Sequence, residues 1–188
     1  NNGELIFRNN KDSKQDLVTE EEFENFELSI EWNISKGGNS GIFYGVKEFP
    51  ELDEAYKSGP EIQVLDNENF FTATKLHRSP SLYDLVGPDE NNVKVNPHGE
   101  WNHLLLKIDH KKNIGTVTMN GQLAFSYPLS GPEWDKLISK YKFRYKEYYV
   151  NRGTDNEFLA FGAFKSGKIG LQDHGSDVKF RNIKIREL

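Results

Sequence analysis

FELSIEWNI, the stretch Phe26–Ile34, decides the fold of this chain, because apolar and polar residues alternate along all of it. Successive side chains of a β-strand point to opposite faces, so every second residue shares a face. The residues of one face are all apolar: Phe26, Leu28, Ile30, Trp32 and Ile34. Such a strand is typical of an antiparallel sheet that packs on a core with one side and meets solvent with the other.

Further short strands are predicted along most of the chain. They include residues 4–7, 40–46, 101–108, 115–119, 122–127 and 178–185. Asn120-Gly121 is the strongest tight-turn signal and separates two of them. Turns recur about every 8–12 residues, a spacing typical of a two-sheet antiparallel sandwich and not of a parallel α/β fold.

One α-helix is predicted near the middle of the second half of the chain. Its apolar residues recur at i, i+3, i+4 and i+7, as Trp134, Leu137, Ile138 and Tyr141. Pro132 stands near its start, where proline is well tolerated. Thr19 and Glu22 have the spacing of a capping box, which predicts one further helical turn. The predicted fold class is therefore all-β, with one short helix.

Composition excludes several classes of protein. The 188 residues carry 24 basic and 29 acidic side chains, a net charge of −5, and no basic stripe, so we expect no nucleic-acid partner. The absence of cysteine excludes disulfides and thiolate chemistry, and no apolar run is long enough to span a membrane. No repeat or linker divides the chain, which predicts a single β-sandwich domain over residues 1–188. The chain begins without methionine, so a missing leader carries no information about secretion.

The first candidate for a functional strand is the segment GPEIQVLD, residues 59–66. Alternation places Ile62 and Val64 on one face and Glu61 and Gln63 on the other. A partly buried carboxylate has a raised pKa, which a general acid or base requires, so Glu61 is the leading catalytic candidate. The alternative is a solvated glutamate on the outer face of a sheet.

The second candidate is the segment KIGLQDHG, residues 168–175. Ile169 and Leu171 point one way, and Gln172 and His174 point the other. Histidine titrates near neutrality and can transfer protons, so His174 is the second catalytic candidate; the alternative is a turn histidine held by a local hydrogen bond. Together the two segments predict a polar cleft on the outside of a well-packed sheet.

No cofactor is predicted. The oxygen-rich runs 66–69 and 89–92 are the candidates for calcium, but neither has EF-hand spacing, and solvated turns are the alternative. The remaining histidines have no metal-ligand spacing, and the sequence lacks a nucleophile elbow, a Walker loop and a dinucleotide fingerprint.

Aromatic side chains are plentiful and suit a sugar ligand, whose C–H faces pack on flat rings. The candidates are Tyr44, Phe70, Phe71, Tyr83, Trp101, Tyr145, Tyr148 and Tyr149. The alternative is that most of them pack in the core. Tyr44 and Tyr83 lie close to polar turns and are the stronger candidates.

Several motifs, taken in order, resemble those of one bacterial family. Besides the two segments above, they are GNSGIFY at 38–44, SLYDL at 81–85, GEWN at 99–102, MNG at 119–121 and FRNIKI at 180–185. From about Leu17 onward, the chain resembles the 3-keto-disaccharide hydrolases, a family of glycosyl hydrolases. The resemblance implies a concanavalin A-like jelly roll, a periplasmic or cell-surface location in Bacteroidetes, and action on oxidised glycosides.

The resemblance also implies a set of site residues. The residues that match the family pattern are Glu61, Gln63, Asp66, Tyr83, Gln172 and His174. Glu61 and His174 are expected to be catalytic, and the expected substrate-binding residues are Gln63, Gln172, Asp66, Tyr83, Asn39 and Tyr44. The chain departs from the pattern at Gly45, where members often carry Arg or His, and at Ser79-Pro80-Ser81, where they usually have Gly.

The chemistry follows from the ketone. A carbonyl at C3 of a sugar acidifies the hydrogen on C2, so a base can remove that proton and the glycosidic bond at C1 can break by elimination, followed by hydration. Ordinary glycoside hydrolysis needs two carboxylates at a defined separation, and Glu61 has no obvious carboxylate partner on the second segment. We therefore expect Glu61 and His174 to divide the proton transfers while Gln63 and Gln172 bind hydroxyls.

Two other functions are compatible with the same residues. One is a lectin-like module that binds carbohydrate without chemistry, and the other is a structural or adhesive domain of a surface protein, since the fold does not decide the function. An enzyme requires that Glu61 and His174 converge on one partly enclosed pocket. An open aromatic face would favour the binding module, and a packed face would favour the structural role.

Overall fold

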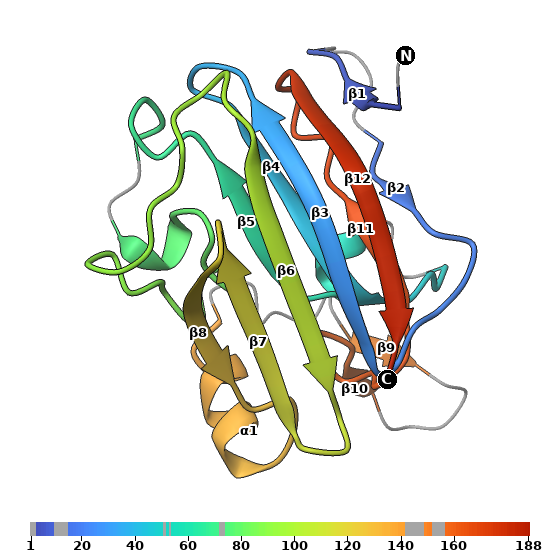
Figure 1. Cartoon of the computed structure of the whole chain (residues 1–188). Helices are drawn as coiled ribbons and strands as arrows, with labels where there is room; N and C mark the ends of the chain where they lie inside the picture. The colour runs from blue at the N-terminus through green and yellow to red at the C-terminus, as the bar shows by residue number, and fades with distance from the viewer. Residues whose placement is uncertain are drawn as a thin grey trace.

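Two antiparallel sheets face each other in this computed structural model (Figure 1). It describes residues 3–9, 15–50, 52, 54–71, 74–141, 149–151 and 157–188, of which 149–151 and 157–159 are described by their backbone alone. The six-stranded sheet has the order β1-β12-β3-β6-β7-β8. Its strands are β1 (Leu5–Phe7), β3 (Phe26–Ile34), β6 (Asn102–Asp109), β7 (Ile114–Met119), β8 (Gln122–Tyr127) and β12 (Val178–Glu187).

The four-stranded sheet lies behind it in Figure 1 and has the order β2-β11-β4-β5. Its strands are β2 (Leu17–Val18), β4 (Asn39–Val46), β5 (Glu61–Leu65) and β11 (Lys168–Leu171). The remaining elements are the pair β9 (Tyr149–Asn151) and β10 (Glu157–Leu159), the helix α1 (Pro132–Ile138), and the 3₁₀ turns η1 (Ala55–Lys57) and η2 (Lys75–His77). Within the described ranges, the prediction of a two-sheet antiparallel sandwich with one short α-helix is confirmed.

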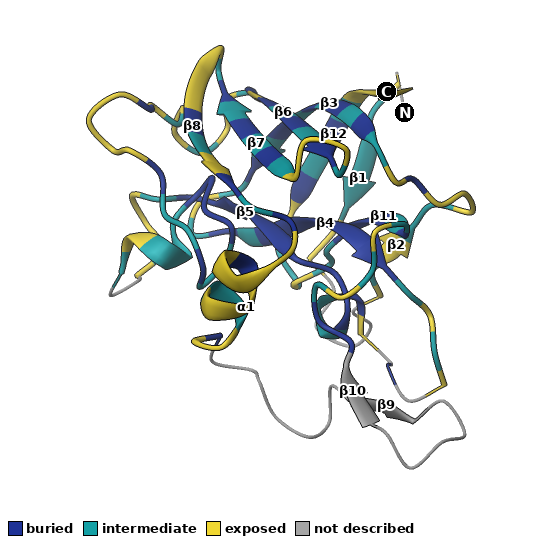
Figure 2. Cartoon of the chain, turned by 90° about the horizontal axis from the view of Figure 1, so that it is seen from below, coloured by how far each residue is buried: buried dark blue, intermediate teal, exposed yellow. Residues whose placement is uncertain are grey.

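The core lies between the two sheets, which Figure 2 shows as an upper and a lower layer. β3 buries its apolar face as predicted, since every second residue from Phe26 to Ile34 is at most 2% exposed. From the other sheet, Ile42, Ile62 and Val64 join the same core. The side chains between them along β4 and β5 must therefore point to the outer face of the four-stranded sheet.

The tight turn between β7 and β8 forms where the sequence predicts it. Asn120 and Gly121 both have positive φ, 49° and 79°, as the hairpin turn requires. The capping-box prediction at Thr19 is wrong. The Thr19 hydroxyl donates to the Glu21 carbonyl at 2.7 Å and accepts from the Ile169 N–H at 3.1 Å, so it joins the chain to β11 and starts no helix.

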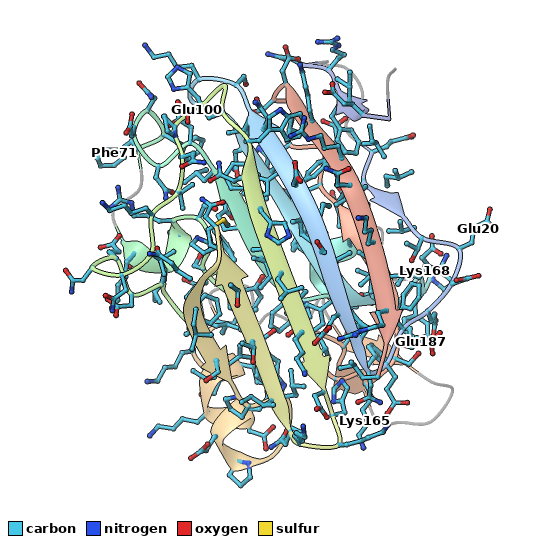
Figure 3. All side chains as sticks on the ribbon, in the orientation of Figure 1. Glu20, Phe71, Glu100, Lys165, Lys168 and Glu187 are labelled. Carbon is cyan, nitrogen blue, oxygen red and sulfur yellow. The ribbon has the colours of Figure 1, made fainter. Side chains whose placement is uncertain are left out.

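Charged side chains of both signs surround the sandwich. Figure 3 labels Glu20, Glu100, Lys165, Lys168 and Glu187, which lie around the periphery of the molecule. No helix in the described ranges could span a bilayer.

Candidate active site

A pocket of about 350 Å³ opens on the outer face of the four-stranded sheet. Its lining residues come from the sheet and from the loops around it: Asp16, Asn39, Glu54, Tyr56, Glu61, Gln63, Tyr83, Tyr141, Gln172, Asp173 and His174. Six of the eight residues predicted for the site are among them. The two predicted segments, more than a hundred residues apart in the sequence, therefore meet at one pocket.

β5 supplies two side chains to the floor of this pocket. Ile62 and Val64 face the core, so Glu61 and Gln63 project into the pocket, where they are only 8% and 3% exposed. The Tyr83 N–H donates to the Glu61 carbonyl at 2.9 Å, which fixes the backbone of β5 on its free edge. Glu61 is thus a largely buried carboxylate and not the solvated glutamate of the alternative interpretation.

Gly41 makes room for the Glu61 carboxylate. Gly41 lies on β4 opposite Gln63, two residues along from Phe43, the partner of Glu61. A Cβ at position 41 would stand 2.2 Å from Oε1 of Glu61 and 2.7 Å from its Cδ, far inside van der Waals contact. Any larger residue at position 41 would displace the carboxylate.

Amide groups lie beside Glu61. The Gln63 Nε2 donates to the Asn39 Oδ1 at 2.7 Å, and the Asn39 N–H donates to the Ser176 hydroxyl at 3.0 Å. These contacts tie the ends of β4 and β5 to the loop after β11. Both amides therefore have a fixed orientation before any ligand binds.

Gln172 comes from the end of β11 and has a rigid backbone. Its N–H donates to the Gly41 carbonyl at 2.9 Å, and its carbonyl accepts from the Ser40 hydroxyl at 2.8 Å. Its side-chain Oε1 is buried and has no hydrogen-bond partner within the described part of the chain. An unpaired buried acceptor costs free energy, and a hydroxyl donor from a ligand in the pocket would remove that cost.

Asp16 is a pocket residue that the sequence did not reveal. Its Oδ1 accepts from the Asp173 N–H at 3.0 Å. Burial raises the pKa of the Asp16 carboxyl to about 6; the Asp173 N–H opposes this, and the negative charges of Glu54 and Asp173 add to it. No local sequence pattern marks Asp16 as a site residue, because it reaches the pocket only through the pairing of β2 with β11. In that pairing Leu17 lies opposite Leu171.

His174 lies in the same pocket but at its exposed rim. The preceding Asp173 accepts the Gly175 N–H at 3.0 Å, which closes a turn with Gly175 at a φ of 78°. His174 therefore reaches the pocket that Glu61 also lines from a tight turn.

Three tyrosine rings complete the walls. Tyr83 stacks on His77 with 4.7 Å between ring centroids, and the His77 Nε2 lies 2.8 Å from an Asp84 carboxylate oxygen. Tyr141 stacks on Phe161 at 4.0 Å, and Tyr56 follows from η1. Flat rings beside amides and carboxylates are the usual lining of a sugar-binding pocket.

Among the described residues, the aromatic candidates Phe70, Phe71 and Trp101 do not line the pocket. Trp101 packs against the Arg181 guanidinium, 3.8 Å from its ring centroid, and Phe71 is 92% exposed, at the position labelled in Figure 3. Tyr145 and Tyr148 lie outside the described residues, as does the side chain of Tyr149.

Tyr44 is not in the pocket, contrary to the sequence prediction. It shares the inward face of β4 with Ile42 and is 6% exposed in the core. Its hydroxyl accepts from the Tyr127 hydroxyl at 2.9 Å, a hydrogen bond between the two sheets. Burial raises the pKa of Tyr44 well above its usual value, so it is a structural phenol.

Asp66 also lies outside the pocket lining. Its carboxylate accepts backbone N–H groups of Gly37 at 2.8 Å, Glu68 at 3.1 Å and Asn69 at 3.3 Å. Burial raises the pKa of Asp66, but these hydrogen bonds outweigh it and hold the pKa below its usual value. Asp66 therefore organises the loops at the end of β5.

The calcium candidates are both used within their own turns. Asp66 binds the backbone as above, and Asp89 accepts from the Asn91 N–H at 3.2 Å and the Asn92 side chain at 2.6 Å. Among the described residues, no three His, Asp or Glu side chains form a group that could hold a metal ion. Gly45 has a φ of 66°, so the local backbone conformation favours glycine at this departure from the family pattern.

Comparison with known proteins assigns this chain to a family. The model of the 3-keto-alpha-glucoside-1,2-lyase-like domain matches residues 1–186. The chain belongs to this family. The resemblance drawn from the sequence motifs is thus confirmed.

Relatives of this chain include a curated 3-keto-disaccharide hydrolase of Bacteroides thetaiotaomicron, which is 38% identical over an alignment of 194 residues that covers 92% of this chain and 62% of that protein. The chain therefore spans about three fifths of the length of this relative. A crystal structure of a candidate glycosyl hydrolase from Parabacteroides distasonis superposes with a TM-score of 0.82 at 26% identity, covering 100% of this chain and 82% of that one.

A carbohydrate-binding module of Bacillus subtilis, of the CBM66 type, superposes on this chain with a TM-score of 0.51 at 12% identity, covering 93% of this chain and 82% of that one. A galectin-like protein of the same organism gives the same TM-score and identity, covering 92% and 76%. These two matches concern the fold alone, and they agree with the predicted lectin-like jelly roll.

Proposed function

We propose that this domain cleaves the glycosidic bond of 3-keto-glycosides, with 3-keto-disaccharides as the main substrates. The observation that carries the proposal is the Glu61 carboxylate, 8% exposed on the floor of a tyrosine- and amide-lined pocket. The family and the relative from Bacteroides thetaiotaomicron support the choice of substrate.

Glu61 is assigned the removal of the C2 proton. The C3 ketone makes this proton acidic, so a single carboxylate suffices as the base. The resulting enolate expels the group on C1 and leaves a C1–C2 double bond, to which water then adds. His174, at the exposed rim, would exchange protons between the pocket and solvent.

The amides and rings are assigned to binding. The buried Gln172 Oε1 would accept a sugar hydroxyl, and the Gln63–Asn39 pair would hold a second hydroxyl from its fixed orientation. Tyr56, Tyr83 and Tyr141 would pack on the C–H faces of the ring.

The alternative function is a module that binds sugar without cleaving it. The carbohydrate-binding module of Bacillus subtilis resembles this chain in fold. The two functions differ in what they need from Glu61. A binding module could use the carboxylate only to accept a sugar hydroxyl, whereas a proton transfer requires it at a fixed place, so turnover of a keto substrate distinguishes the two functions. We also propose a periplasmic or cell-surface location, which fractionation of the producing cells would test.

The direct test is the turnover of 3-keto-disaccharides and of the same disaccharides without the ketone. We expect only the keto substrates to be cleaved, with a primary isotope effect when C2 carries deuterium. Glu61→Gln should lower kcat by about 10²- to 10⁴-fold, the usual contribution of a general base. Glu100→Gln, at an exposed position far from the pocket lining, is the matched control. Wild-type activity in Glu61→Gln, or equal cleavage of both substrates, would contradict the proposal.

A further inference from the structure

Two carboxylates stand between the pocket and a second cavity. This second cavity, of about 500 Å³, is lined by Gln15, Asp16, Val18, Val46, Lys47, Glu48, Phe49, Leu52, Glu54 and Ala55. Asp16 and Glu54 also line the first pocket. The two cavities are therefore neighbours, and these two residues mark the boundary between them.

We propose that the second cavity receives the leaving group of the glycoside and that Asp16 is the general acid that protonates the glycosidic oxygen. The inference rests on the proposed function, since it places the 3-keto ring over Glu61 in the first pocket. The glycosidic oxygen joins the ring to the leaving group, so in a substrate that fills both cavities this oxygen must lie at their boundary. Asp16 lines that boundary from both sides.

The lining of the second cavity suits an alcohol such as a second sugar. Val18, Phe49 and Leu52 contribute apolar surface, and Lys47 and Glu48 contribute charge. Both cavities fall in the size range of ligand pockets, about 300–1,000 Å³.

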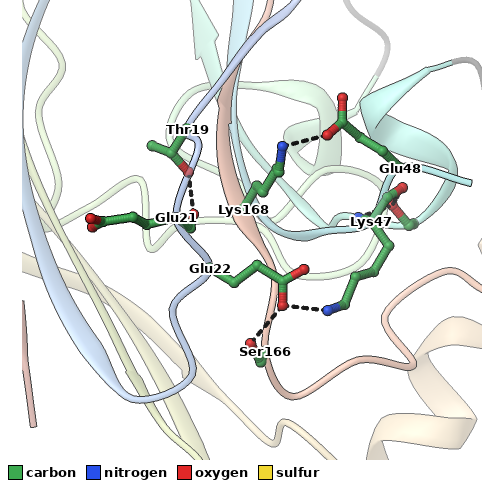
Figure 4. Close-up of polar contacts among 8 residues, drawn as sticks. Thr19, Glu21, Glu22, Lys47, Glu48, Ser166 and Lys168 are labelled. Atoms are coloured by element: carbon green, nitrogen blue, oxygen red, sulfur yellow. Dashed lines mark hydrogen bonds and ion pairs between the residues drawn. The ribbon is translucent and has the colours of Figure 1, made fainter.

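Ion pairs hold the charged residues of this cavity in place (Figure 4). The Lys47 Nζ lies 2.5 Å from the Glu22 Oε2, which also accepts from the Ser166 hydroxyl at 3.0 Å. Lys168 pairs with Glu48 in the same way. The wall is therefore fixed before a ligand enters, which reduces the entropy lost on binding.

Asp16 fits the role of acid better than its neighbours. Glu54, on the same boundary, is exposed, and His174 lies at the rim of the first pocket only. The Asp173 N–H holds one oxygen of Asp16 at 3.0 Å, which fixes the carboxyl. Burial, opposed by that N–H and reinforced by the charges of Glu54 and Asp173, raises the pKa of Asp16 to about 6, so part of the population carries the proton near neutral pH.

The Glu61 carboxylate takes the C2 proton, and the C–H electron pair forms the enolate. The enolate electrons then form the C1–C2 double bond, the C1–O bond breaks, and its electron pair stays on the glycosidic oxygen. The Asp16 carboxyl donates its proton to that oxygen and becomes a carboxylate. In the hydration, Asp16 removes a proton from water as its oxygen adds to C1, and Glu61 returns a proton to C2.

The test varies the leaving group. Two substrates, a 3-keto-disaccharide and 4-nitrophenyl 3-keto-glucoside, share the ring but differ in their need for an acid, because nitrophenolate leaves without a proton. In Asp16→Asn we expect kcat to fall about 10²- to 10⁴-fold on the disaccharide and less than about tenfold on the nitrophenyl substrate. Asp16→Ser should show the same selectivity and serves if the first variant does not fold.

Glu100→Gln removes an exposed carboxylate outside the lining of both cavities; it is the matched control and should leave both substrates at the wild-type rate. An equal loss on both substrates in the Asp16 variants would overturn the assignment of the acid. A wild-type protein that cleaves neither substrate would overturn the proposed function instead.

The place of the leaving group has its own test. Val18→Phe adds volume to the wall of the second cavity, with the melting temperature measured to verify folding. We expect the ratio of the KM for the 3-keto-disaccharide to that for methyl 3-keto-glucoside to rise at least about tenfold, because only the disaccharide extends into this cavity. An unchanged ratio in the folded variant would place the leaving group elsewhere.

Discussion

The carboxylate of Glu61 occupies the space in which a side chain on Gly41 would lie, with 2.2 Å between a Cβ built there and Oε1. The two residues are on neighbouring strands, β5 and β4, whose register brings Gly41 opposite Gln63. The site therefore requires glycine at position 41, because a side chain there would take the space of the Glu61 carboxylate.

Gly41→Ala should displace Glu61 and leave the fold intact. The new Cβ would lie 2.2–2.8 Å from Oε1, Cδ and Cγ of Glu61, and its three nearest atoms include no backbone atom, so the Glu61 side chain would have to take another rotamer. A catalytic group misplaced by about 1 Å costs about 100-fold in rate, and we expect a loss of kcat of that order. Steady-state kinetics and thermal unfolding measure the two effects.

The double variant shows whether Gly41 acts through Glu61. In a Glu61→Gln background, Gly41→Ala should cause little further loss, because residues that share one function are not additive. Additive losses in the double variant would mean that Gly41 acts by another route.

The pH profile should report Asp16. If its protonated form is the acid, kcat/KM for a 3-keto-disaccharide falls as the pH rises through about 6. Glu54→Gln removes a negative charge that favours the protonated form, so the pKa of Asp16 decreases and the alkaline limb moves to lower pH. An alkaline limb that Glu54→Gln leaves in place would assign it to another group.

Gln172→Leu should have opposite effects on stability and binding. The buried Oε1 has no partner in the described structure, so its removal should leave the free energy of unfolding unchanged or raise it. Loss of a hydrogen bond of about 1 kcal/mol to a sugar hydroxyl should raise KM by roughly fivefold. Urea unfolding and KM are the measurements, and an unchanged KM would remove Gln172 from the binding site.

Tyr44→Phe should affect stability and not catalysis. The Tyr127 hydroxyl would lose its acceptor inside the core, which costs about 1–3 kcal/mol of unfolding free energy. KM for the keto substrate should stay at the wild-type value, because Tyr44 faces the core and not the pocket. A raised KM with normal stability would return Tyr44 to the substrate-binding residues.

Asp66→Asn should destabilise the protein in a pH-dependent way. The carboxylate accepts three backbone N–H groups, and hydrogen bonds to a charged group contribute about 1.5–3 kcal/mol. Its pKa is lowered on folding, so this contribution is present above the ordinary pKa of 3.8 and is lost as the pH falls through the lower folded value. The difference in unfolding free energy between wild type and variant should therefore shrink below about pH 4; a constant difference would point to a cause other than the charge.

Local pattern was sufficient to predict the layers of this fold. The alternation along Phe26–Ile34 gave the buried face of β3, and Asn120-Gly121 gave the turn between β7 and β8. Alternation also placed Glu61 and Gln63 opposite the core side chains Ile62 and Val64. Period-2 patterns carry this information because a strand's faces are set by neighbouring residues alone.

The same reasoning misplaced Tyr44 and Asp66. Tyr44 is a sequence candidate because it lies close to a polar turn. It shares a face with Ile42, however, and only the position of Tyr127 shows that its hydroxyl is paired within the core. Asp66 matched the family pattern, yet its role is to bind the N–H groups of its own turn and of Gly37. A matched residue can therefore be a structural one.

By itself, the sequence determined the sandwich, the outward face of β5 and the family, since these depend on alternation and on motifs read in order along the chain. Only the tertiary structure decided the partners of Glu61. Gly41 meets Glu61 through the pairing of β4 with β5. Asp16 reaches the pocket through the pairing of β2 with β11, whose residues are about 150 positions apart in the sequence. Strand register is fixed by packing between distant segments, and no local pattern encodes which side chains that register brings together.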